Sequence, residues 1–103
     1  MHGKVKTTKL QMLMRDLETI YMKESENVDS FFTHVIDHVT QIRSHGETLE
    51  ERRIVENVLR SLPARFDLII MAIEDTNDLS QLSWNELHAS LIYHEHRLNR
   101  VTS

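Results

Sequence analysis

The chain has 103 residues and no cysteine, with 40% hydrophobic and 27% charged residues and a formal net charge of −4. This length and composition predict one globular domain with one core, and no apolar run approaches the length of a membrane span. Without cysteine there is no disulfide, zinc knuckle or thiol chemistry in these residues. The 12 basic residues are scattered among 16 acidic ones, which predicts no direct nucleic-acid binding by this segment.

Two glycines and one proline, with abundant leucine, isoleucine, glutamate and arginine, predict an all-α fold with short connections. Residues 1–3 are typical of an expression-tag remnant, and a single helical domain is expected over residues 4–103. Helices are predicted at about 6–22, 28–45, 49–62, 64–74 and 84–99.

The first predicted helix has one apolar face. Met12 and Met22 fall outside that face. Its members recur at helical spacing, and they are Leu10, Leu13, Met14, Leu17, Ile20 and Tyr21.

A polar turn over residues 23–26 precedes the second helix, and Asn27 is a good N-cap. Gly46 supplies a left-handed stop at the end of that helix. Thr48 and Glu51 have the spacing of a capping box at the start of the third helix. The apolar stripe of the second helix is the strongest amphipathic pattern in the chain, and it consists of Val28, Phe31, Phe32, Val35, Val39 and Ile42.

Pro63 ends the third helix and suits the first turn of a fourth. Ser83 and Glu86 form a second capping box, after a polar loop. The inward residues expected on these helices are Ile54, Val55, Val58, Leu59 and Leu62, then Phe66, Ile69, Ile70 and Ile73, then Leu87, Leu91 and Leu98.

Seven histidines raise the question of a metal site, since His34 and His38 have the i, i+4 spacing that two imidazole ligands need. His45 falls on the same stripe, but no cysteine or acidic third ligand does, so we predict no metal and no other cofactor. The alternative is that the histidine stripe makes association depend on pH. No phosphate loop, nucleophile elbow or paired-metal motif is present, so we expect neither enzymatic activity nor a small-molecule substrate.

Residues that the core pattern leaves over, together with one flank of the third helix, are candidates for an oligomer interface, although any one of them could instead edge the core. On the third helix they share one flank, and on the fourth and fifth helices they lie off the apolar stripe. These candidates are Ile54, Asn57, Ser61, Leu68, Met71, Ile92 and Tyr93.

The segment from residue 22 to residue 66 resembles the Gag polypeptide of copia-type LTR retrotransposons. The family pattern K-E-x-E-S-V-x-x-Y/F is matched by Lys23, Glu24, Glu26, Val28 and Phe31. The second pattern, V-x-x-x-L-x-S-L-P-x-x-F, is matched further along the chain by Val55, Leu59, Ser61, Leu62, Pro63 and Phe66.

The resemblance implies an orthogonal bundle similar to the C-terminal lobe of retroviral capsids, with one preceding helix. It also makes the turn at Glu24, Glu26, Val28 and Phe31 similar to the major homology region, although Met22, Lys23 and His34 replace that motif's glutamine, glycine and arginine.

The function implied is homotypic association that builds a virus-like shell in the cytoplasm, around RNA bound by other parts of the parent protein. The partner would be the chain itself, as homodimer or higher oligomer, with no membrane. The alternative is a domesticated dimerisation or adaptor domain, similar to SCAN domains, that recruits another protein.

Overall fold

The computed structural model describes residues 2–76, 78 and 81–102, and this part of the chain contains helices and no strand. The all-α prediction is confirmed. The elements are α1 (His2–Thr19), α2 (Val28–Ser44), α3 (Glu51–Arg60), a 3₁₀ turn η1 (Ala64–Phe66), α4 (Asp67–Thr76) and α5 (Trp84–Thr102). Helix α1 therefore includes His2 and Gly3, which the sequence analysis had set aside, and it ends at Thr19 instead of continuing to residue 22.

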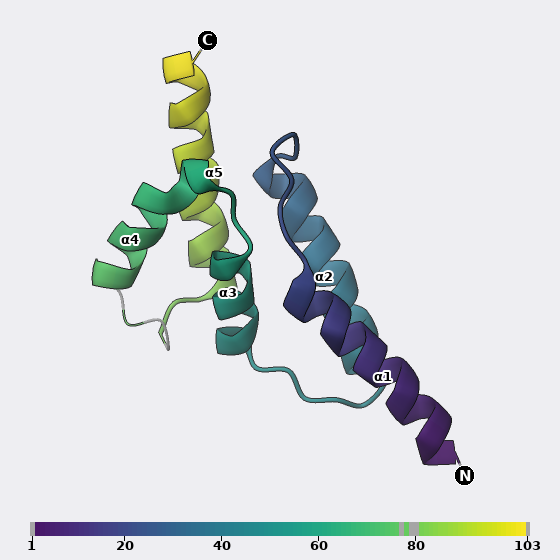
Figure 1. Cartoon of the computed structure of the whole chain (residues 1–103). Coiled ribbons are helices and arrows are strands. Elements are labelled where there is room, and N and C mark those ends of the chain that lie inside the picture. Colours follow the sequence, from purple (N-terminus) through teal and green to yellow (C-terminus); the bar gives the residue numbers. More distant parts are fainter. Residues whose placement is uncertain (1, 77, 79–80, 103) are drawn as a thin grey trace.

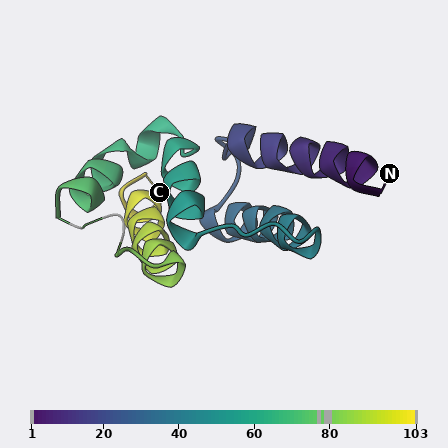
Figure 2. The same cartoon turned by 90° about the horizontal axis from the view of Figure 1, so that it is seen from below.

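The helices form two groups that meet along α2 and α5 (Figures 1 and 2). Helix α1 lies antiparallel to α2 in one group, while α3, α4 and α5 form the other. The radius of gyration is 15.3 Å and the principal extents are 56 × 29 × 18 Å. A compact domain of this length has a radius of gyration of roughly 13 Å, so the arrangement is elongated.

The core is built on α2, whose predicted stripe is buried at all six positions from Val28 to Ile42. Phe31 and Phe66 are fully buried. Leu87 and Leu91 are also fully buried and bring α5 against α2, next to a stack in which the Phe32 ring lies 4.6 Å from the ring of His88. Leu62, Ile69, Ile70 and Leu98 were expected inward and are half-buried.

Three of the predicted end signals are confirmed. The side chain of Asn27 accepts a hydrogen bond from the backbone N–H of Ser30 at 2.8 Å. Gly46 has φ 86°, the left-handed conformation that glycine adopts without steric cost. Ser83 and Glu86 exchange two hydrogen bonds of 3.0 Å, one from each backbone N–H to the other side chain, which is the reciprocal pattern of a capping box.

The capping box predicted at Thr48 and Glu51 was wrong. Helix α3 begins at Glu51 with Glu50 as N-cap, and no side-chain bond caps this end. Instead, the Glu51 carboxylate accepts the backbone N–H of Trp84, at the start of α5. The Glu51 carboxylate can join α3 to α5 in this way because the start of α5 also has backbone N–H groups without a partner inside the helix.

The assignments of Tyr21 and Met22 were reversed. Tyr21 is 65% exposed, whereas Met22 is 3% exposed and belongs to the core. Helical spacing does not apply beyond Thr19, where α1 ends. In the extended segment that follows, the Met22 backbone N–H donates to the Ser61 carbonyl at 2.9 Å, and successive side chains point to opposite sides.

Candidate functional site

The turn between α1 and α2 closes on itself through its own polar groups. The backbone N–H of Lys23 donates to the Glu26 carboxylate at 2.9 Å, and the N–H of Glu26 donates to the Lys23 carbonyl at 3.0 Å. Each group satisfies a backbone donor that a tight turn would otherwise leave to solvent. Residues 23–26 therefore adopt a defined conformation directly before α2.

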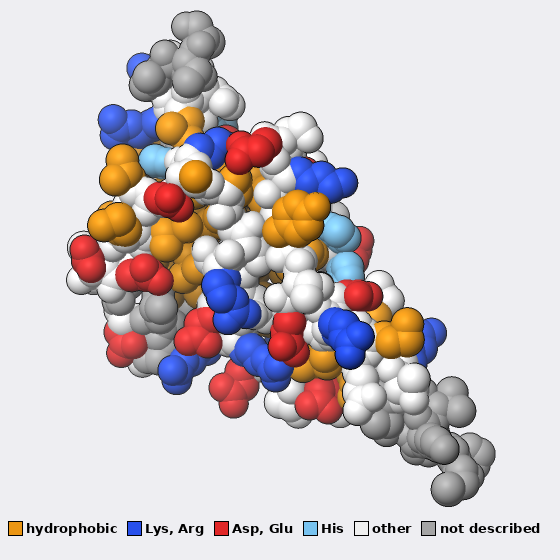
Figure 3. Space-filling view, in the orientation of Figure 1, with side chains coloured by type: hydrophobic (Ala, Val, Ile, Leu, Met, Phe, Trp, Pro, Cys, Tyr) orange, Lys and Arg blue, Asp and Glu red, His pale blue; other side chains and the backbone are white. Residues whose placement is uncertain are grey.

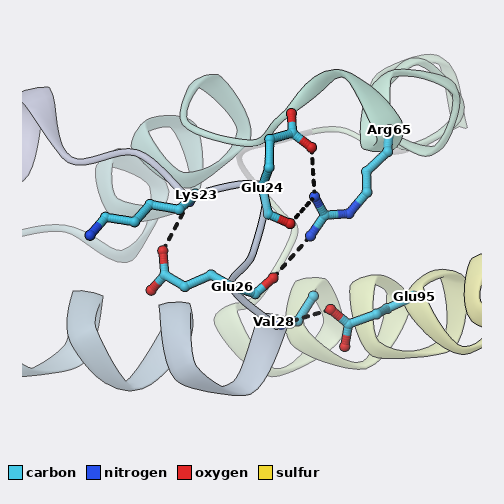
Figure 4. A network of polar contacts seen from close by, with 6 residues as sticks. All are labelled: Lys23, Glu24, Glu26, Val28, Arg65 and Glu95. Atoms are coloured by element: carbon cyan, nitrogen blue, oxygen red, sulfur yellow. Dashed lines mark hydrogen bonds and ion pairs between the residues drawn. The ribbon is translucent and has the colours of Figure 1, made fainter.

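Arg65 lies in η1, 41 residues after Glu24 in the sequence, and it binds this turn (Figure 4). Its guanidinium Nη1 donates to the Glu24 carbonyl at 3.0 Å and to the Glu24 carboxylate at 3.1 Å, and Nη2 donates to the Glu26 carbonyl at 2.9 Å. The planar guanidinium presents several donors at fixed angles, so one side chain can hold two consecutive parts of the turn. The same guanidinium lies 5.0 Å from the centre of the Phe66 ring.

Helix α5 holds the first residue of α2. The Glu95 carboxylate accepts the backbone N–H of Val28 at 2.9 Å (Figure 4). This N–H is one of the unpaired donors at the start of a helix, where a negative charge is also favoured by the helix dipole. The turn is therefore bound by η1 and α5 as well as by its own residues.

The sequence-predicted turn residues lie together in the structure. Glu24 and Glu26 accept the hydrogen bonds described above, and Val28 and Phe31 are fully buried behind them. Sequence reasoning missed Arg65 and Glu95. Arg65 stands inside the L-P-x-x-F pattern, so its position two residues after Pro63 could have indicated a role, whereas nothing in the sequence distinguishes Glu95 from other exposed-face acids.

Two of the predicted interface residues are largely covered within the chain. Ile54 is 4% exposed, which confirms its place among the expected inward residues, and Asn57 is also 4% exposed but lines a hollow beside α3. The short helix α3 is covered on more than one side, because α5 packs on it and the end of α1 approaches it through an Arg53–Glu18 ion pair of 3.4 Å. A substitution at Ile54 would perturb the core before it could report on association.

The other predicted interface residues differ in their exposure to solvent. Leu68 and Met71 on α4 are 78% and 58% exposed, and Tyr93 on α5 is 66% exposed. Ile92 and Ser61 are half-buried. In Figure 3, hydrophobic side chains gather over α4 and the adjacent part of α5. We call the exposed side of α4 together with Tyr93 the α4–α5 surface.

The family model described as gag-polypeptide of LTR copia-type matches residues 1–103. The chain belongs to this family. No curated protein and no solved structure matches this Gag chain. Gag polypeptides are structural rather than catalytic proteins. The turn at residues 23–28 is thus a feature of a Gag fold, and its hydrogen bonds hold helices in place.

The three histidines of the predicted stripe lie along and just after α2. The rings of His34 and His38 are 5.0 Å apart, and the His38 Nδ1 atom lies 3.1 Å from the His34 carbonyl oxygen. His45 Nδ1 lies 2.8 Å from the Gln41 carbonyl oxygen. Within the described residues, no three histidine or acidic side chains are grouped as metal ligands would be, and no helix has the length and apolarity of a membrane span.

Proposed function

We propose that this Gag chain is a self-association domain whose copies bind one another through the α4–α5 surface. Repeated contacts of this kind build a virus-like capsid shell in the cytoplasm. The chain carries a net charge of −4, which disfavours contact with a nucleic-acid backbone. The enclosed RNA is therefore bound by other parts of the parent protein.

The observation that carries the proposal is the composition of α4. Its residues 68–73 are six consecutive apolar residues, Leu-Ile-Ile-Met-Ala-Ile, yet only Ile73 among them is buried. A helix that is apolar on every side is normally covered on every side. In this chain one side of α4 faces the core and the other is open, so a second copy is the partner that would complete its burial.

Shell formation does not require each contact to be strong. Many weak contacts between identical copies act together, because each bound neighbour raises the effective concentration of the next. A surface with a few exposed apolar side chains such as Leu68, Met71 and Tyr93 suits a contact of modest strength.

The test is sedimentation of the isolated chain across a range of concentrations, compared with a Leu68→Glu, Met71→Glu double variant. We expect the parent chain to form dimers or larger species and the double variant to remain monomeric. Both side chains are exposed, so helicity measured by circular dichroism should be unchanged.

A Met12→Glu variant is the matched control, because Met12 is a 62% exposed methionine on α1, away from α4. It should associate as the parent chain does. A parent chain that is monomeric at every concentration would refute self-association by this domain. Equal losses in the control and the double variant would remove the α4–α5 surface from the contact.

A further inference from the structure

A groove runs along α3, between that helix and the end of α1. Its first part is a hollow of about 600 Å³ lined by residues 18–24 and 60–63. Its second part is a hollow of about 400 Å³ lined mainly by charged residues of α3. Glu18 and Arg60 line both hollows, so the two parts are neighbours.

The first part of the groove has an apolar wall and the second part is polar. Ile20, Leu62 and Pro63 are half-buried in the wall of the first hollow. In the second hollow lies Asn57, which is the buried polar residue among those whose burial is described. Figure 3 shows positive and negative side chains interspersed over α3.

Asn57 has an unused donor. Arg60 Nη2 donates to Asn57 Oδ1, and because arginine can only donate, this contact fixes which end of the amide carries the oxygen. The Asn57 Nδ2 atom is buried and has no acceptor within the described part of the chain. Such a buried, unpaired donor is unfavourable, and it indicates an accepting group that a partner would supply.

Arg60 offers further donors at the same place. Its side chain is exposed, and its guanidinium carries five N–H groups, of which the contact with Asn57 uses one. Arg52 and Arg53, by contrast, are in ion pairs with Glu56 and Glu18 at 3.5 and 3.4 Å. Arg60 and Asn57 together therefore suit a group that only accepts hydrogen bonds.

The charge of the hollow limits what that group can be. Three arginines and three glutamates line it, the latter being Glu18, Glu50 and Glu56. These carboxylates would repel a phosphate chain, whose charges are multiple and closely spaced. Two of these arginines are in ion pairs with Glu56 and Glu18, so Arg60 is the arginine beside Asn57 that can pair with a single carboxylate side chain, while the exposed Glu50 also remains in the lining.

We propose that this groove receives α4 of a second copy, and that Asp75 of that copy binds Arg60 and Asn57. The inference rests on the self-association proposed above. Leu68, Met71 and Asp75 are exposed and spaced by three and four residues, so they lie along one face of α4. That face presents two apolar side chains and then a carboxylate, and the groove presents an apolar wall and then the donor pair.

Leu68 and Asp75 are seven residues apart on a helix, which corresponds to about 10 Å, so the pairing requires the apolar wall and the donor pair to be about that far apart. The contact is heterologous, since α4 of one copy binds α3 of the next, and such contacts generate rings or open arrays.

Two single variants and their mixture test the pairing. Arg60→Asp and Asp75→Arg should each weaken self-association at least tenfold in sedimentation, because each places like charges together. Mixed in equal amounts, the two variants should form heterodimers, since the intact Asp75 of one variant can bind the intact Arg60 of the other. Lys9→Asp, a charge reversal at an exposed residue of α1 that lines neither hollow, is the control and should associate normally.

The outcomes separate this inference from the proposal on which it rests. If both variants associate as the parent chain does, while Leu68→Glu, Met71→Glu does not, the α4–α5 surface stands and the groove is not its partner. If the variants are weakened but their mixture shows no heterodimer, the pairing of Asp75 with Arg60 is overturned. A monomeric parent chain overturns both.

Discussion

Helices α2 and α4 are both rich in apolar residues, but they differ in how many of those residues are buried. In α2 all six residues of the apolar stripe are buried, and Glu95 of α5 binds the first backbone N–H. In α4 the six consecutive apolar residues include one buried side chain, that of Ile73. The comparison teaches that apolar content alone does not assign a helix to the core.

The difference arises from the neighbours of each helix. Helix α2 is packed between α1 and α5, whereas α4 follows η1 at the edge of the second helix group (Figure 1). Its periodic face, at Ile69, Ile70 and Ile73, turns toward the core and continues from Phe66 of η1, whereas Leu68 and Met71 lie outside the core. Substitutions in the two regions should therefore affect different measurements.

The largest effect is expected at Phe31, which is fully buried on α2. Phe31→Ala removes a ring from the centre of the core and should lower the free energy of unfolding by about 3–5 kcal/mol. A domain of this size has total stability of the same order, so the variant should be largely unfolded. Thermal denaturation followed by circular dichroism measures this.

Tyr21→Ala is the aromatic control, because Tyr21 is 65% exposed. Its thermal midpoint should stay close to that of the parent chain. An unchanged midpoint for Phe31→Ala would show that this ring does not lie in the core.

An intermediate effect is expected at Arg65, which binds the turn before α2. Arg65→Ala removes three hydrogen bonds and leaves the Glu24 and Glu26 carbonyls to solvent, so we expect a loss of about 1.5–3 kcal/mol in urea denaturation. Arg65→Lys should recover little of it, since an ammonium group cannot span two carbonyls in the same fixed geometry.

Arg52→Ala serves as the matched arginine variant. Its ion pair with Glu56 joins two exposed side chains on one helix, and such pairs contribute little. If Arg52→Ala and Arg65→Ala were equally destabilising, the turn network would have no special part in stability.

The smallest effect on stability is expected on α4. Leu68 is 78% exposed, so Leu68→Ala should change the free energy of unfolding of the monomer by no more than about 0.5 kcal/mol. Urea denaturation at low protein concentration measures this without a contribution from association. A loss comparable to that of a core leucine would place Leu68 in the fold and weaken the contrast between α2 and α4.

Much of the fold followed from local patterns. The α2 stripe, Asn27, Gly46 and the Ser83–Glu86 box each depend on residues within a few positions of one another, and the structure confirms them. The turn was recognised through its resemblance to Gag, and its own residues, Lys23 and Glu26, do bond to each other.

The errors occurred where long-range contacts compete with local ones. Glu51 has the spacing of a capping box, yet it binds Trp84, which is 33 residues away. Met22 was placed outside the helix stripe, yet its backbone binds Ser61 and its side chain enters the core. Asn57 was assigned to an open flank, yet it is 4% exposed, because the sequence does not show that α1 ends close to α3.

The sequence by itself therefore determined the helices, most of their ends and the membership in the Gag family, because these depend on short-range periodicity, capping and motif spacing. Only the tertiary structure decided which apolar residues remain exposed, and that Arg65 and Glu95 bind the turn. The physical reason is that burial and long-range hydrogen bonds depend on which helices become neighbours, and a helical pattern identifies an apolar face without identifying what covers it.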